Sequence, residues 1–322
     1  MSSIQRENRM RPAWGGVDGG ESMYAYRMDR DRADQTVAHL GAVLSESLQV
    51  ITQLFLHASI LKDRGHPLAQ RYYQEWVDTM RRSDNLLQGI LALGGRPASR
   101  EPARLDLGRE PRRILELDIA LGERWVAALE ATATNCTAEG SDETASMLIE
   151  LLDAESASLD WRRNQRDEFA NGGDEPAPSP SVDGALIDAL NDVLRAELSA
   201  ITQAYYHGQL FETWGDEKLG EFMAKETWEK TWRSLDLTKH LLATGGHPTE
   251  DGHGQLRIGR DVGEILDRDR EFVDSQLAAL DTALERCDSA RNPEIHDLLS
   301  KMQEGEQKHA DWIAAQMTSV DR

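Results

Sequence analysis

Apolar residues recur every three or four positions along this chain, over stretches far longer than a β-strand. Leu48, Ile51 and Phe55 belong to one such stripe, and their spacing places apolar side chains on one face of an α-helix. Helix-breaking segments, such as GGRP at 94–97 and Asn-Pro at 292–293, separate the stripes. Helix ends are expected at such segments. The pattern therefore predicts an all-α protein.

The helical pattern occurs twice. The segment LLQGILALGGRP, which ends at Pro97, recurs as LTKHLLATGGHP, which ends 151 residues later at Pro248. Cys136 and Cys287 are also 151 residues apart, whereas ITQLFLHA recurs as ITQAYYHG after 150 residues. The single added residue lies between the first and second helices of the later copy, where a loop can absorb it. A repeat of this kind determines the architecture before any local prediction, and it indicates two copies of one four-helix unit.

Each copy is predicted to form a four-helix bundle. The connection between the second and third helices, residues 94–108, is long enough to cross the bundle, as in ferritin-like topologies. We expect a polar N-terminal arm over 1–33, a first bundle over 34–168 and a second bundle over 185–322. Residues 169–184, rich in Pro, Ser, Gly and acidic side chains, are expected to be an extended linker.

The amino-acid composition argues against several classes of function. The 36 Lys and Arg residues against 57 Asp and Glu give a net charge of −21, which disfavours a phosphate-binding surface and therefore nucleic acid. Two cysteines are too few for a disulfide scaffold and fit a reducing cytoplasm. We expect neither a signal peptide nor a membrane span, because long apolar runs are missing. These features predict a soluble cytoplasmic protein.

Longer segments carry a more specific signal. HLGAVLSESLQVITQLFLHA, RRSDNLLQGILALGGRP and AESASLDW follow one another in the first copy, and LNDVLRAELSAITQAYYHG, IGRDVGEILDRD and EQKHADW take the corresponding places in the second. In this order and spacing each copy resembles a subunit of the bacterioferritins, within the ferritin-like superfamily. The resemblance extends over nearly the whole chain outside the arm and the linker. It implies two ferritin-like four-helix bundles, oxidation of Fe(II) at a buried di-iron site, and iron storage in a hollow shell.

The resemblance also implies the iron ligands. They are a Glu on the first and third helices, and a Glu-x-x-His pair on the second and fourth. The second copy retains three of these at Glu197, Glu306 and His309. Its other three ligand positions hold Lys230, Arg233 and Val273. The first copy retains Glu155, and its remaining ligand positions hold Ser47, Thr79, Arg82, Gly122 and Ser158.

These replacements have a physical logic. Without iron, the buried carboxylates would stay unpaired, at a cost of several kcal/mol. We expect Lys230 and Arg233 to form ion pairs with Glu197 or Glu306, and the first copy offers an arginine beside its remaining glutamate in the same way. The alternative for the second copy is a single residual metal ion held by Glu197, Glu306 and His309.

Bacterioferritins also bind haem between two subunits, each of which gives one Met sulfur from its second helix. Met80 falls on that position in the first copy, and Thr231 in the second. Four further residues match positions that line the family's haem pocket: Leu48, Ile51, Phe55 and Tyr73. A methionine at helical spacing also serves as core filling. If haem binds, either two chains meet through their first copies, or the two copies of one chain pair and Met80 is the one sulfur ligand.

We interpret the chain as a tandem bacterioferritin-like protein with degenerate di-iron sites, which binds haem or acts as a structural component of an assembly. The alternative is an iron-oxidising and iron-storing ferroxidase that uses the residual site of the second copy, so enzymatic activity stays open. The short fifth helix of the family's shell has no counterpart after either fourth helix. We therefore expect self-association of one or a few chains through the bacterioferritin-type interface, with a further protein partner as an option, and no closed cage.

Overall fold

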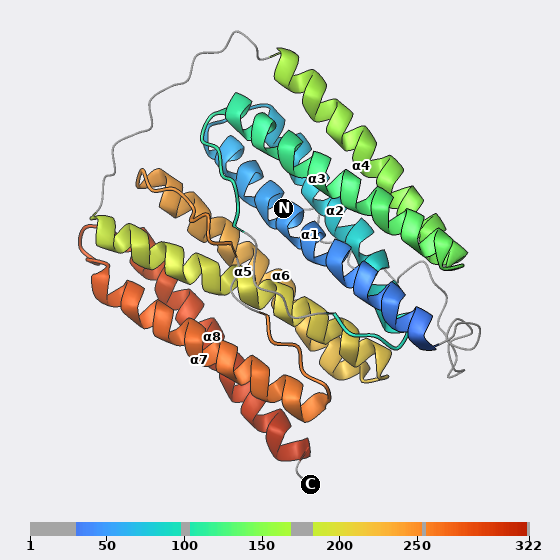
Figure 1. Ribbon diagram of the computed structural model, residues 1–322. Helices are drawn as coiled ribbons and strands as arrows, with labels where there is room; N and C mark the ends of the chain where they lie inside the picture. The colour runs from blue at the N-terminus through green and yellow to red at the C-terminus, as the bar shows by residue number, and fades with distance from the viewer. Residues whose placement is uncertain (1–29, 98–103, 169–182, 253–255, 321–322) are drawn as a thin grey trace, which may run out of the picture.

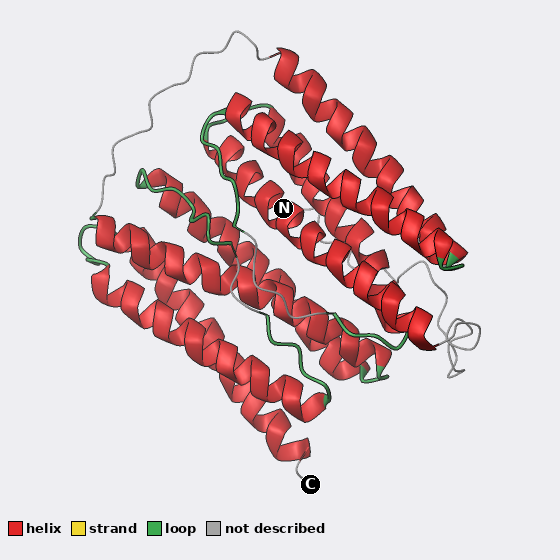
Figure 2. Ribbon diagram, in the orientation of Figure 1, coloured by secondary structure: helices red, strands yellow, loops and turns green. Residues whose placement is uncertain are grey.

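The computed structural model describes residues 30–97, 104–168, 183–252 and 256–320, and every regular element in these ranges is an α-helix (Figure 2). The first bundle contains α1 (Arg30–Asp63), α2 (Leu68–Ala92), α3 (Pro111–Ala138) and α4 (Asp142–Glu168). The second contains α5 (Gly184–Thr213), α6 (Glu217–Ala243), α7 (Val262–Arg286) and α8 (Pro293–Val320). The predicted all-α class and the two four-helix bundles are confirmed. Most of the predicted arm and linker lies outside the described residues.

Capping side chains, prolines and glycines mark the ends of the helices. Asp216 caps α6, because its Oδ1 accepts a hydrogen bond from the Leu219 backbone N–H at 3.1 Å. α8 begins at Pro293, as predicted, since the fixed φ of proline suits a first helical turn. Gly94 and Gly245 follow α2 and α6 with φ of 74° and 80°, a left-handed conformation that favours glycine.

The helices of each bundle pack in the same order. In bundle 1, α1 packs against α2 and α3, and α4 packs against α3 and α2; α5 to α8 repeat this arrangement in bundle 2. Among the described helices, α2 and α3 are not a closely packed pair, and neither are α6 and α7. The long connection between them therefore crosses the bundle, which confirms the predicted topology.

A buried histidine and a buried aspartate hold each crossing connection in place through hydrogen bonds. His57 Nδ1 lies 2.8 Å from Asp118 Oδ2, and the backbone N–H of Gly108 donates to His57 Nε2 at 3.0 Å. Because Nε2 accepts, the ring proton is on Nδ1 and is donated to the carboxylate. His207 and Asp269 form the same pair in bundle 2, at 2.7 Å. These histidines join the first helix, the crossing loop and the third helix, so they are structural.

The two bundles meet through their first and second helices. α1 packs against α6, and the Gln88 side chain on α2 donates to the Gln209 side chain on α5 at 2.5 Å. The crossing loops also meet, since the Leu105 N–H donates to the Glu250 carbonyl at 2.7 Å. α1 and α5 run in opposite directions (Figure 1). The first two helices of each copy therefore form the contact between the bundles, with α1 on α6 as its closely packed pair.

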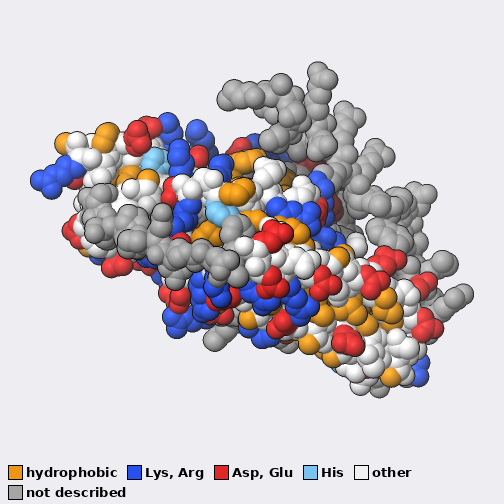
Figure 3. All heavy atoms as spheres, turned by 90° about the horizontal axis from the view of Figure 1, so that it is seen from above, with side chains coloured by type: hydrophobic (Ala, Val, Ile, Leu, Met, Phe, Trp, Pro, Cys, Tyr) orange, Lys and Arg blue, Asp and Glu red, His pale blue; other side chains and the backbone are white. Residues whose placement is uncertain are grey.

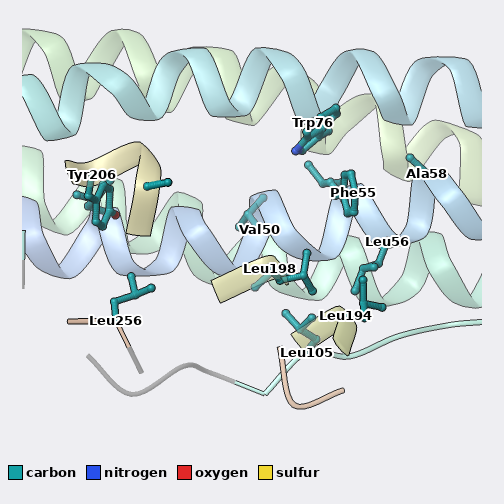
Figure 4. Close-up of a cluster of buried hydrophobic side chains, with 14 of the residues drawn as sticks. Val50, Phe55, Leu56, Ala58, Trp76, Leu105, Leu194, Leu198, Tyr206 and Leu256 are labelled. Atoms are coloured by element: carbon teal, nitrogen blue, oxygen red, sulfur yellow. The ribbon is translucent and has the colours of Figure 1, made fainter. Parts of the chain in front are cut away.

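Apolar side chains continue across this interface. One cluster of buried residues includes members of both bundles, and Val50 and Leu56 of α1 lie near Leu194 and Leu198 of α5 (Figure 4). Each buried Leu or Val side chain of this kind contributes about 1.5–3 kcal/mol relative to its exposed state. The pair of bundles is therefore held by a shared core.

Charged side chains cover much of the outside. Figure 3 shows Lys and Arg interleaved with Asp and Glu over one face, with scattered apolar side chains between them. In the described part of the chain, no helix has both the length and the apolar character that crossing a bilayer requires.

Candidate functional site

The centre of bundle 2 is a buried cluster of charged side chains. Lys230 on α6 donates from Nζ to Glu306 Oε1 on α8 at 2.5 Å, and Arg233 Nη2 donates to the same oxygen. Arg233 Nη2 also lies 3.7 Å from Glu197 Oε2 on α5. Lys230, Glu197 and Glu306 are each at most 1% exposed. The predicted ion pairs are thus confirmed.

A glutamine on α7 links the two sides of this cluster. Gln276 Oε1 accepts from Lys230 Nζ at 3.2 Å, and Gln276 Nε2 donates to Glu197 Oε1 at 3.1 Å. An amide can satisfy a cation and an anion at once, because it carries both an acceptor and a donor. Sequence reasoning did not single out Gln276, although it stands where the first copy has Trp125.

His309 lies at the edge of the cluster, and it is 4% exposed. Its Nδ1 is 3.3 Å from Glu226 Oε2 and 3.9 Å from Glu306 Oε2. Glu226 was missed in the sequence. Lys230 follows Glu226 by four residues, so both side chains lie on one face of α6. Glu75 stands at the equivalent position in the first copy, and this repetition is the signal that could have identified Glu226.

The pKa values of the two central carboxyl groups in bundle 2 are shifted in opposite directions. Burial by itself raises the pKa of Glu306, but Lys230 and Arg233 outweigh it and hold that pKa well below its usual range. For Glu197, burial dominates, and the pKa is raised despite the nearby cations. Glu306 is therefore the carboxylate that the fixed cations neutralise.

Bundle 1 has its own buried charges. Arg82 Nε donates to Glu155 Oε1 at 2.9 Å, as expected from the sequence. A second arginine, Arg162 on α4, is 1% exposed and donates from Nη2 to Glu75 Oε2 at 3.4 Å. A Cβ at Gly122 would lie 3.3 Å from Arg162 Nη1, so the loss of a side chain on α3 makes room for the guanidinium. Arg162 was also missed, although it lies one turn beyond Ser158 on the same helix face.

Metal ligation was the alternative predicted for bundle 2. Glu306 and His309 lie together on α8, whereas Glu197 is held by Gln276 and Arg233. Within the described residues, no group of three or more His, Cys, Asp or Glu side chains is arranged to hold a metal ion. Because Glu306 Oε1 accepts from two cations, a metal ion at that oxygen would have to displace them.

The predicted haem-pocket residues lie on α1 and α2, the helices through which bundle 1 meets bundle 2. Most of them are half-buried: Leu48, Ile51, Tyr73 and Met80. Phe55 is 3% exposed, and its ring centroid lies 5.1 Å from that of Trp76. Sequence reasoning did not name Trp76, which extends the aromatic wall.

Bundle 2 presents different residues at the equivalent positions. Tyr205 stands where bundle 1 has Phe55, and its Oη is buried without a hydrogen-bond partner among the described residues. Thr231 stands where bundle 1 has Met80; it is 5% exposed, and its Oγ1 donates to the Thr227 carbonyl at 2.8 Å. The two sides of the interface therefore differ in their side-chain chemistry.

A groove of about 640 Å³ lies between α5 and α7 of bundle 2. Its walls carry small side chains, among them Ala189, Ala196, Ala278 and Ala279. Gln276 also lines it, so the groove reaches the amide that contacts the buried charges. In bundle 1 the larger Trp125, 1% exposed, occupies the equivalent place.

The family model of the ferritin-like domain matches the chain twice, over residues 37–171 and 187–322. The chain belongs to the ferritin-like family. A bacterial ferritin of Neisseria meningitidis serogroup B is 30% identical over 138 residues, which are 42% of this chain and 89% of that protein. Bacterioferritin of Mycobacterium bovis is 26% identical over 140 residues, 44% of this chain and 88% of that protein. The chain is thus a tandem bacterioferritin-like protein, as its sequence predicted.

Among solved structures, the chain matches Rhodobacter capsulatus bacterioferritin, described with a metal-free dinuclear site and haem iron in a crystallographic special position. The identity is 27% and the TM-score 0.42, over 44% of this chain and 89% of that one.

Proposed function

We propose that this ferritin-like protein binds haem between its two bundles and does not oxidise iron at their centres. The observation that supports this best is the pairing of Glu306 with both Lys230 and Arg233. Fixed cations take the place that iron would need, and they are retained because a buried carboxylate without a partner is costly. The residual site of Glu197, Glu306 and His309 is therefore the weaker candidate.

The residues at the interface fit a haem. Met80 offers a thioether, a soft ligand that suits haem iron, and it is half-buried on α2. Phe55 and Trp76 form an aromatic wall, with their ring centroids 5.1 Å apart. Tyr205 Oη, buried without a partner among the described residues, would gain one from a polar group of the ligand.

The packing favours a site within one chain. The helices of bundle 1 that carry the candidate haem residues pack against α5 and α6 of the same chain. A second chain would have to displace bundle 2 to meet bundle 1 through this face. Bound haem would supply one-electron chemistry, while Met80 would hold the iron and the aromatic wall would exclude water.

The test is an absorbance spectrum of the purified protein before and after haem is added. We expect a Soret band that Met80→Leu abolishes and that Met302→Leu, a matched change in the core of bundle 2, leaves in place. Both variants conserve volume and should cost under about 1.5 kcal/mol of stability. A protein that shows no Soret band with added haem contradicts the proposal.

The ferroxidase alternative has its own measurement. Aerobic addition of Fe(II) should give no faster rise in ultraviolet absorbance than buffer does. A rapid rise that disappears in Glu306→Gln would favour iron oxidation instead.

We also expect light scattering to report a small species of one or a few chains, because the faces that pair in this family are used within the chain. We propose a cytoplasmic location, which suits the two buried free cysteines. A protein partner would be found by its co-purification with this species.

A further inference from the structure

The outer face of α6 carries two neighbouring exposed tryptophans. Trp228 is 42% exposed and Trp232 is 52% exposed. They are four residues apart, so their side chains lie beside each other on one face of the helix. An exposed apolar patch with a polar rim is typical of a protein contact surface, and tryptophan is enriched among the residues that dominate binding energies.

This patch lies on the side of α6 that faces away from the charged cluster. Lys230, which is 1% exposed, points into the centre of bundle 2. Each tryptophan is two residues from Lys230, and two residues turn a helical side chain by about 200°. The patch therefore contributes neither to the core of bundle 2 nor to its buried ion pairs.

Charged side chains continue the same stripe beyond both ends of the patch. At about 100° per residue, a stripe about 80° wide along α6 contains the two tryptophans and four exposed charged residues: Glu221, Lys225, Asp236 and Lys239. From the start of the helix, the order is acidic, basic, two tryptophans, acidic, basic. Read from the other end, every sign is reversed. The stripe is therefore complementary in charge to a reversed copy of itself.

The positions of these residues also agree with one two-fold axis. The midpoint of residues 228 and 232 is 230, and the midpoint of residues 221 and 239 is also 230. Two antiparallel copies of α6 centred there bring Trp228 of each chain against Trp232 of the other. They also place Glu221 opposite Lys239, and an isologous contact forms each of these pairs twice.

Bundle 1 has no such stripe. The residues 151 positions earlier are Val77 and Arg81 in place of the tryptophans, and uncharged polar side chains in place of the four charged ones: Gln70, Gln74, Asn85 and Gln88. Each chain therefore offers this surface once. An isologous contact through a single surface closes at a dimer and does not extend into a filament.

We propose that the outer face of α6 is a homodimer interface, on which α6 of a second copy of this chain packs in the antiparallel direction. The stripe from Glu221 to Lys239 is about 27 Å long. One helix pair of this length forms a small interface, so the dimer is weak and reversible. The contact does not use the surface between the two bundles, and it is independent of haem.

Sedimentation velocity of the full chain over a series of concentrations tests the dimer. We expect a reversible monomer–dimer equilibrium with a Kd in the micromolar range. Trp232→Arg introduces the residue that bundle 1 has and should raise the Kd at least tenfold. Ile149→Arg, a change at a 47% exposed residue of α4, should leave the Kd unchanged. A wild-type chain that is still monomeric at about 1 mM, or a dimer that Trp232→Arg does not weaken, overturns the proposal.

A charge exchange tests the antiparallel direction. Glu221→Lys places two lysines opposite each other in the dimer and should weaken it severalfold. The double variant Glu221→Lys with Lys239→Glu reverses both charges and should restore the wild-type Kd. Both residues are exposed, so circular dichroism should show an unchanged helical fold. A double variant that dimerises no better than Glu221→Lys alone overturns the antiparallel arrangement.

Discussion

The two bundles pair their buried charges in different ways, although their backbones repeat. In bundle 2, two cations from α6 converge on Glu306, and Gln276 links them to Glu197. In bundle 1, one arginine from α2 pairs with Glu155, and a second arginine, from α4, pairs with Glu75. The pKa values of the equivalent carboxyl groups, Glu155 and Glu306, are thus shifted in opposite directions. Burial raises the pKa of Glu155 despite Arg82, whereas the two cations lower the pKa of Glu306.

This comparison shows that net neutralisation of the centre matters more than any particular pair. The residues that supply the partners differ between the two copies, but each of these buried carboxylates has a cation beside it. Four changes can test this difference between the bundles, and they are taken in order of the expected effect.

Glu306→Gln should have the largest effect. It leaves the buried Lys230 and the half-buried Arg233 without their shared carboxylate, so we expect a loss of about 3–5 kcal/mol in the free energy of unfolding. Urea denaturation followed by circular dichroism measures it. Glu304→Gln, exposed on the same helix, should stay within about 0.5 kcal/mol of wild type. A loss under about 1 kcal/mol for Glu306→Gln would mean that the cluster does not depend on this carboxylate.

Trp125→Gln gives bundle 1 the residue that bundle 2 has at the equivalent position, Gln276. Trp125 is 1% exposed, and truncating such a side chain leaves a cavity and a buried amide without the partners that Gln276 has. We expect a loss of about 3 kcal/mol in the same urea measurement. Trp161→Gln, a half-buried tryptophan of the same bundle, should cost clearly less. Equal losses in the free energy of unfolding for the two variants would show that the burial of Trp125 does not make its truncation more costly.

Asp84→Asn tests the contact between the bundles. Burial, and then the charge of Glu212 on α5, raise the pKa of Asp84 to about 7. A pKa above the unfolded value means that stability is fully present below the unfolded pKa and is lost as the pH rises through about 7. Wild type should therefore be about 1–2 kcal/mol less stable at pH 8 than at pH 6 through this group. Thermal unfolding of the variant should lack this part of the pH dependence, and an unchanged profile would contradict the assignment.

Glu155→Gln should have the smallest effect. Because the pKa of Glu155 is raised, its ionised form is disfavoured in the folded state, and a neutral amide removes that penalty. Arg82 has a quarter of its side chain exposed and can still reach water. The free energy of unfolding of the variant should lie within about 1 kcal/mol of the wild-type value at pH 7. As the pH falls towards 4.5, the wild-type protein should become more stable relative to the variant. A loss as large as that of Glu306→Gln would remove the distinction between the bundles.

Much of this molecule follows from its sequence because the information is local or repeated. Helical periodicity and the 151-residue repeat predicted the two bundles and the crossing connections. The pairing of Lys230 and Arg233 with Glu306 was also predictable, since buried charges need partners. Neither Arg162 nor Gln276 was foreseen, because each contacts residues on other helices and lies outside the ligand positions of the family.

The sequence alone determined the helices and their order, because these depend on the spacing of residues along one helix. The tertiary structure alone decided that the two copies pair with each other inside one chain. It also decided that Arg162 fills the space beside Gly122, and that Tyr205 is left buried without a partner among the described residues. Such features depend on which side chains from distant helices occupy one volume, and close packing settles that in three dimensions.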